Sequence, residues 1–149
     1  MAHMSTPGDS RWFRVVLTIG FVYLVAGLVF AELAKSASST EVRTGWRLAA
    51  WVISAAAFAA HIGYEHLRLI ASPRTTALHA AAAVALAALG LAVAANVHGL
   101  RVGSSHQTAL MISLVAWPVL LAIPSFITAF AATAILTLLR RGPSTSTHT

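Results

Sequence analysis

The residues best suited to chemistry lie in one short stretch, His61-Ile-Gly-Tyr64-Glu65-His66-Leu-Arg68. Glu65 is the one acid inside any long apolar run of the chain, and ionisable groups in such runs are costly and usually functional. His61 precedes Glu65 by four residues and Arg68 follows it by three, so a helix would place them on one face. Tyr64 lies at the edge of that face. His66 is turned by about 100° away from Glu65.

Two more polar residues follow the turn at Ser72-Pro73, namely Arg74 and His79. This turn sends the chain back, so His79 should return to about the depth of His66. A buried carboxylate is stable only when it is paired. We therefore expect Glu65 to pair with Arg68 or His61 on its own helix, or with Arg74 or His79 across the turn.

Three interpretations of this cluster remain open. In the first, its residues simply end a helix at the membrane surface, within reach of water. In the second, they bind a proton, an ion or a small anionic or amphipathic ligand, and the site comprises His61, Tyr64, Glu65, Arg68, Arg74 and His79. In the third, a b-type haem lies between two helices, with His66 (or His61) and His79 as axial ligands. A metal held by His61, Glu65 and His79 is a weaker alternative, because paired ligands four residues apart are frequent by chance.

Composition places these residues in a membrane protein. Of the 149 residues, 58% are hydrophobic and 9% are charged, whereas soluble domains average about 25% charged. The net charge of +6 comes from basic residues that bracket apolar runs. This pattern indicates contact with lipid headgroups and no role in binding nucleic acid. The chain has no cysteine, which excludes thiol redox chemistry and thiolate metal sites.

Four apolar segments must position the cluster, and they cover about residues 12–33, 46–70, 76–97 and 108–139. Each approaches or exceeds the roughly 20 residues that cross a hydrocarbon core of about 30 Å, and backbone in lipid must be helical. The short connections predict antiparallel neighbours. We therefore predict an all-α, up-down bundle of four transmembrane helices over 11–141. We expect disorder in 1–10, where 1–3 resemble a cloning remnant, and in the tail 142–149.

The basic residues also give a weak prediction of orientation, because cytoplasmic loops are enriched in lysine and arginine. The end that carries both termini holds six of them: Arg11, Arg14, Arg68, Arg74, Arg140 and Arg141. The opposite end holds four: Lys35, Arg43, Arg47 and Arg101. We expect both termini in the cytoplasm. The alanine-rich composition is typical of a high-GC bacterium, which indicates a bacterial cytoplasmic membrane.

Three of the segments have features that predict how they pack. Small residues recur at helical spacing at Ala83, Ala87, Gly90 and Ala94 in the third segment, and with Tyr23 at Gly20, Gly27 and Ala31 in the first. Such faces let helices approach closely, either within the chain or in a homo-oligomer or larger complex. In the fourth segment, Pro118 and Pro124 predict kinks, because each removes an amide donor. Ser113, Ser125 and Thr128 are available to bond the freed carbonyls.

These observations give three hypotheses about function and identify no catalytic residue, no metal and no resident cofactor. The first is a non-enzymatic subunit or accessory factor that packs through its small-residue faces, with the bilayer and other chains as partners. The second is a small bundle that binds or transports a ligand, an ion or a proton through the cluster at the end of the second helix. The third is an electron carrier with haem b.

Overall fold

The computed structural model describes residues 9–68 and 72–140, with side chains described from residue 12 onward. This part of the chain forms four helices: α1 (Asp9–Lys35), α2 (Thr40–Arg68), α3 (Pro73–Arg101) and α4 (Gln107–Arg140). All four are long and apolar enough to cross a membrane. The predicted all-α fold with four membrane-spanning helices is confirmed.

The helices extend beyond the apolar segments that predict them. Helix α2 begins at Thr40, well before residue 46, and α1 begins at Asp9, inside the segment expected to be disordered. The 29 residues of α2 span about 44 Å, more than a hydrocarbon core of about 30 Å. Apolar runs mark the depth of lipid, whereas the helical backbone continues into the polar layer. The expectations for residues 1–8, 69–71 and 141–149 lie outside the described residues.

Local signals fix the turns between the helices. Ser72 caps α3, because its Oγ accepts a hydrogen bond of 3.2 Å from the Thr75 amide and Pro73 starts the helix. This combination of a serine cap followed by proline favours helix initiation. After α3, Gly103 adopts a positive φ of 63°, a conformation that glycine enters without steric cost. The chain can therefore reverse sharply before α4.

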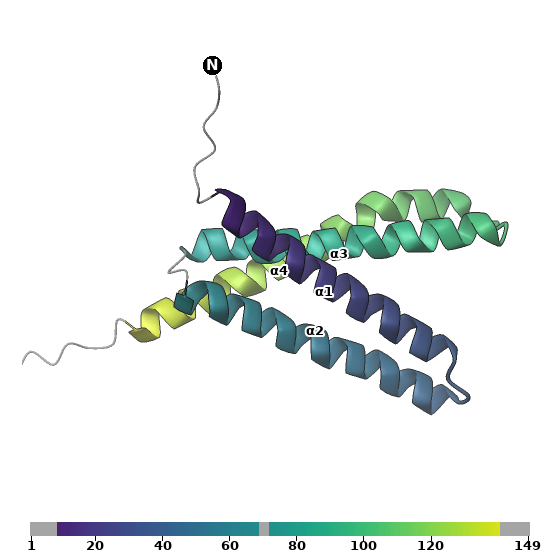
Figure 1. Ribbon diagram of the computed structural model, residues 1–149, viewed down its shortest axis with the longest axis horizontal. Helices are drawn as coiled ribbons and strands as arrows, with labels where there is room; N and C mark the ends of the chain where they lie inside the picture. The colour runs from purple at the N-terminus through teal and green to yellow at the C-terminus, as the bar shows by residue number, and fades with distance from the viewer. Residues whose placement is uncertain (1–8, 69–71, 141–149) are drawn as a thin grey trace, which may run out of the picture.

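The helices form two antiparallel hairpins, α1–α2 and α3–α4, which fan apart from one shared end (Figure 1). The start of α1, the end of α2, the start of α3 and the end of α4 all lie at this end. Helix α3 packs mainly on α4 and α1, whereas α2 shares few contacts with α3 and α4. The bundle is therefore tight at one end and splayed at the other.

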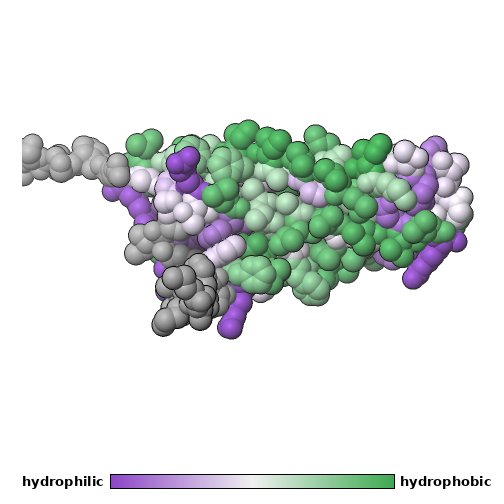
Figure 2. Space-filling model, turned by 90° about the horizontal axis from the view of Figure 1, so that it is seen from above, coloured by the Kyte–Doolittle hydropathy of each residue, from purple (hydrophilic) through white to green (hydrophobic). Residues whose placement is uncertain are grey.

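The surface of the bundle carries an apolar band between two polar ends (Figure 2). Side chains exposed within the band include Phe21 on α1, Trp51 on α2 and Ile123 on α4. Exposed apolar side chains on this scale would be unfavourable in water, but they suit a bilayer. The arrangement supports a multi-pass membrane protein.

The small-residue faces of α1 and α3 pack against each other. Val16 and Tyr23 of α1 form a core cluster with Ala83 and Ala87 of α3. A Cβ atom added at Gly20 would lie 3.1 Å from the Ala83 carbonyl oxygen, so the two backbones approach closely there. At these residues, the small-residue faces of α1 and α3 pack against each other within one chain.

Helix α4 changes direction along its length, following α3 near Gln107 and approaching α2 near Arg140 (Figure 1). Pro118 and Pro124 both lie inside it, and their role in the bend stays a prediction. The serine side chains do not bond to the carbonyls that the prolines free, which are those of Leu114 and Leu120, so this expectation is wrong for both serines. Ser125 donates to the Leu121 carbonyl at 2.7 Å and Ser113 to the Leu110 carbonyl at 2.6 Å, because a side chain reaches most easily the carbonyl three or four residues earlier.

Asn96 links α3 to α4 at the end opposite the cluster. Its Nδ2 donates to the Ala92 carbonyl on its own helix at 2.9 Å and to the Leu110 carbonyl on α4 at 2.6 Å. The Asn96 side chain is buried, so this bond between the two helices is shielded from water. It stabilises the α3–α4 hairpin where its helices meet the turn.

Candidate functional site

Glu65 lies at the centre of the candidate site and is fully buried, with an exposed fraction of 0%. Its Oε1 lies 3.2 Å from Nε2 of His61, one turn earlier on α2. The same oxygen lies 3.0 Å from Nδ1 of His79 on α3. The structure thus brings a carboxylate and two imidazoles together from two helices, at the end where the hairpins converge.

The hydrogen-bond geometry constrains the imidazole tautomers. An ionised carboxylate only accepts hydrogen bonds, so with Glu65 ionised both His61 Nε2 and His79 Nδ1 donate to it. A neutral His61 then carries its proton on Nε2, and its Nδ1 is left as an acceptor. In that tautomer the acceptor nitrogen of His61 lies on the side of the ring away from Glu65.

Trp12 covers His79 from the start of α1. Their rings are stacked, with centroids 5.1 Å apart and planes only 2° from parallel. The indole shields one face of the imidazole and favours its present orientation. Three helices therefore contribute to the cluster: α1 through Trp12, α2 through His61 and Glu65, and α3 through His79.

The remaining residues of the predicted site lie around this centre. Arg68, Arg74 and Tyr64 are exposed, and among the described side chains only the two histidines bond to Glu65. Of the partners that the sequence left open, the structure thus selects the imidazoles and leaves both arginines at the surface. The physical reason is how deep each side chain lies in the membrane, because guanidinium groups near a helix end extend readily to the polar layer.

Several buried polar atoms at this end have no hydrogen-bond partner among the described residues. They are Oε2 of Glu65, Nδ1 of His61, both ring nitrogens of His66, and Oγ1 of Thr76. His66 is 6% exposed and Thr76 is 0% exposed, so bulk water does not reach them freely. Each unpaired buried polar group costs about 1–3 kcal/mol, and native proteins retain few of them. Most of the unpaired buried atoms of the described residues thus lie at this end of the bundle; the others are Oη of Tyr23 and Nε2 of Gln107.

An open groove between α1 and α2 reaches His61. Its volume is about 630 Å³, and its lining residues are Arg14, Val15, Thr18, Ile19, Ala57, Ala60, His61 and Tyr64. One basic residue, three hydrogen-bonding side chains and four apolar ones thus share one surface. His61 lies at the floor of the groove with its side chain fully buried, and its Nδ1 has no partner among the described residues.

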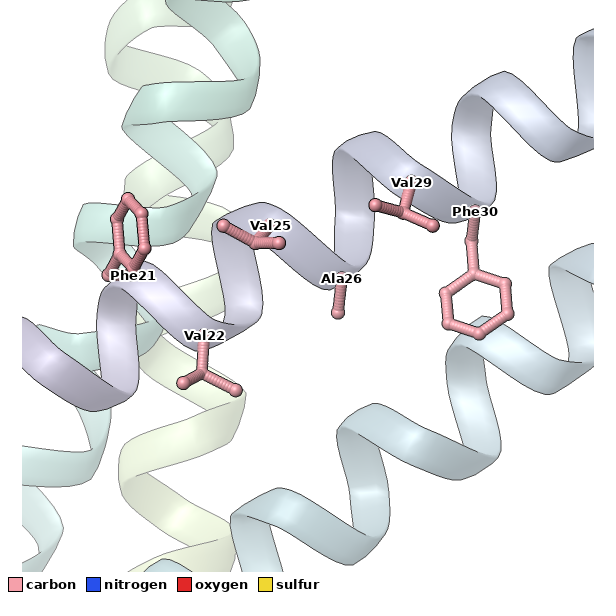
Figure 3. A pocket seen from close by; sticks show the side chains of 6 residues that line it. All are labelled: Phe21, Val22, Val25, Ala26, Val29 and Phe30. Atoms are coloured by element: carbon pink, nitrogen blue, oxygen red, sulfur yellow. The ribbon is translucent and has the colours of Figure 1, made fainter.

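A second, wholly apolar groove follows farther along α1, with a volume of about 330 Å³. Its lining residues are Phe21, Val22, Val25, Ala26, Val29 and Phe30. The side chains of Val22, Ala26 and Phe30 point from α1 toward the side of α2 (Figure 3). Phe30 also contacts Trp46 of α2, with ring centroids 6.1 Å apart.

The haem and metal alternatives differ in how the geometry fits them. Within 9–68 and 72–140, no three His, Cys, Asp or Glu side chains are arranged to hold a metal ion. A b-type haem between His66 and His79 stays a prediction. In this arrangement Nδ1 of His79 bonds to Glu65 and one ring face stacks on Trp12, so Nε2 is the His79 atom that could ligate iron.

Sequence reasoning missed Trp12 and Thr76 as residues of this end. Trp12 fits the pattern of an interfacial tryptophan equally well, so its type alone does not indicate stacking on His79. Topology offers a signal, because α1 and α3 start from the same end of an up-down bundle and Trp12 and His79 both lie near those starts.

Comparisons of this chain with known proteins find no matching family model, no matching curated protein and no matching solved structure.

Proposed function

We propose that this protein is a non-enzymatic membrane protein that binds the polar group of a small membrane-soluble ligand at His61, with Glu65 and His79 holding that imidazole in place. The observation that carries the proposal is the fully buried Glu65–His61 pair beneath a groove that His61 helps to line, with the outer nitrogen of His61, Nδ1, buried and without a partner among the described residues. Intramembrane polar clusters of this kind usually mark ligand or ion sites.

The accessory-subunit hypothesis has less support. It depended on the small-residue faces of α1 and α3, and in this chain residues such as Gly20 and Ala83 pack against each other. Contacts made within the chain do not call for a second protein. The apolar side chains that remain exposed are those that a bilayer would cover.

We further propose that both termini face the cytoplasm of a bacterium, which would open the groove toward the inner leaflet. Arg14, Arg68, Arg74 and Arg140 all belong to the end where the hairpins converge, and basic residues favour the cytoplasmic side. Reporter fusions at the C-terminus test this: an alkaline phosphatase fusion should be inactive and a green fluorescent protein fusion bright. The reverse pattern would contradict the orientation.

The binding proposal can be tested by native mass spectrometry of the protein released from detergent. We expect small molecules to remain bound to the wild type and to be lost from His61→Ala. His106→Ala is the matched control, because His106 is exposed near the start of α4 and lines neither groove; it should keep the bound molecules. Equal retention by His61→Ala and the wild type would overturn the proposal.

A further inference from the structure

The two grooves lie on one continuous face of α1. Their α1 residues run from Arg14 through Thr18 and Val22 to Ala26 and Val29, in steps of three or four, which keeps them on one side of a helix. The opposite side of α1 packs on α3. The polar groove at His61 and the apolar groove ending at Phe30 therefore form one amphipathic surface, which we call the α1 groove.

The α1 groove is long enough for a lipid tail. Val15 and Phe30 are fifteen residues apart, which corresponds to about 22 Å of helix. One acyl tail in a bilayer covers half of a hydrocarbon core of about 30 Å, or about 15 Å. A tail of that extent fits within the groove, and only a long, fully extended chain brings its methyl end near Phe30 and Trp46. The α1 side of the groove is a single helix face, which suits one chain better than two.

The polar end of the groove carries donors and a positive charge. Arg14 offers a planar guanidinium, which binds carboxylates through paired hydrogen bonds. Tyr64 adds a phenolic hydroxyl, and His61 lies just beneath this surface with its side chain fully buried. Glu65 has no exposed surface and does not line the groove, so an anion in the groove meets the exposed Arg14 and Tyr64 and not the carboxylate. This set of groups is complementary to a single negative charge.

We propose that the ligand is a long-chain fatty acid, with its carboxyl group at Arg14 and His61 and its tail along α1 toward Phe30. The proposal rests on the proposed function and names its ligand class. A carboxylic acid can enter from lipid in its neutral form. Beside the exposed Arg14 it releases its proton to bulk water and becomes the carboxylate that the guanidinium binds. A phosphodiester lipid has no such proton to give.

A brominated fatty acid tests this binding mode directly. The probe is stearic acid with two bromine atoms in the distal half of its chain, and bromine quenches tryptophan fluorescence on contact. We expect saturable quenching of the protein in detergent. Trp46→Phe should remove that saturable component. The matched control on the same helix is Trp51→Phe, which should keep it, because Trp51 is 73% exposed and, unlike Trp46, does not contact Phe30 at the end of the groove.

Two further comparisons test the recognition of the carboxylate. Arg14→Ala should weaken binding of the brominated acid by about tenfold, the value of one charge-assisted hydrogen bond. Arg74→Ala removes an equally exposed charge at the same end of the bundle and should have little effect. The methyl ester of the same brominated acid keeps the tail, loses the charge and the transferable proton, and should bind about tenfold or more weakly.

The outcomes separate this inference from the proposed function. If His61→Ala loses bound molecules but the brominated acid gives no saturable quenching at Trp46, the site exists and the fatty-acid assignment is wrong. Equal binding of acid and ester would also overturn the assignment, because it would indicate an ordinary annular lipid. If His61→Ala retains every bound molecule, the proposed function fails as well.

Discussion

Glu65 on α2 and His79 on α3 are joined by a hydrogen bond of 3.0 Å between Oε1 and Nδ1. This bond links two helices that otherwise share few contacts. Because the same oxygen also forms a hydrogen bond of 3.2 Å with Nε2 of His61, one carboxylate oxygen holds two imidazoles in place. Removing it should disturb both the local packing of the hairpins and the site.

Glu65→Ala should lower the free energy of unfolding by about 3–5 kcal/mol, the range for breaking one side of a buried pair. Glu65→Gln should cost less, about 1–3 kcal/mol, because its amide oxygen can still accept from one histidine. Denaturant titration in detergent, followed by circular dichroism, measures both changes. Glu32→Gln is the control, since the Glu32–Lys35 pair is exposed. Equal stability of Glu65→Ala and the wild type would contradict the structural role assigned to Glu65.

Trp12→Ala should destabilise the protein by about 0.5–1.5 kcal/mol beyond the loss of buried area, because it removes the stack on His79. Trp12→Phe should recover most of this loss. The His79 ring should also become more mobile, which broadens its nitrogen-15 resonances in the alanine variant. Unchanged His79 resonances in Trp12→Ala would show that the indole does not hold the imidazole.

Gly20→Ala should destabilise the bundle by about 1–3 kcal/mol, since the added Cβ would lie 3.1 Å from the Ala83 carbonyl oxygen. Gly63→Ala is a matched control in α2, where an added Cβ meets no atom within 4 Å. That control should stabilise the helix by about 0.5–1 kcal/mol, through helix propensity. Thermal unfolding of the two variants should therefore shift in opposite directions, and a shared direction would argue against close α1–α3 packing.

Asn96→Leu should cost about 1 kcal/mol, the usual value of a polar contact between membrane helices, because it removes the bond from Nδ2 to the Leu110 carbonyl. Ser113→Ala should cost less, since Ser113 lies 3.5 Å from Nδ2. Hydrogen exchange at the start of α4 should accelerate in Asn96→Leu. Exchange that is unchanged there would mean that Asn96 does not secure the α3–α4 hairpin.

Much of the fold could be predicted because the bilayer allows few solutions. Long apolar runs with short connections indicate four helices, and the spacing of His61 and Glu65 predicts their contact. The partner of Glu65 across the turn could not be chosen between Arg74 and His79, because that choice depends on which side chain reaches the polar layer. The stack of Trp12 on His79 depends on the crossing of α1 over α3, which the pattern of apolar residues does not specify.

The start of α2 and the serine hydrogen bonds of α4 also combine a feature that the sequence predicts with one that it does not. Hydropathy marks where lipid begins, so it placed the start of α2 near residue 46 although the helix starts at Thr40. The sequence indicated that Ser113 and Ser125 would bond to backbone carbonyls. The choice of Leu110 and Leu121 as acceptors depends on the local rotamer of each serine, which the sequence leaves open.

The central claim is that a group from outside the chain bonds to Nδ1 of His61. Nitrogen-15 NMR of histidine-labelled protein tests it most directly, by comparing the protein as purified with protein stripped of bound molecules and with stripped protein reloaded with stearic acid. His61→Gln identifies the resonances. We predict that Nδ1 of His61 shifts on stripping and is restored on loading, while His98 and His106, both exposed, do not change. An identical His61 Nδ1 resonance in all three samples would contradict the claim.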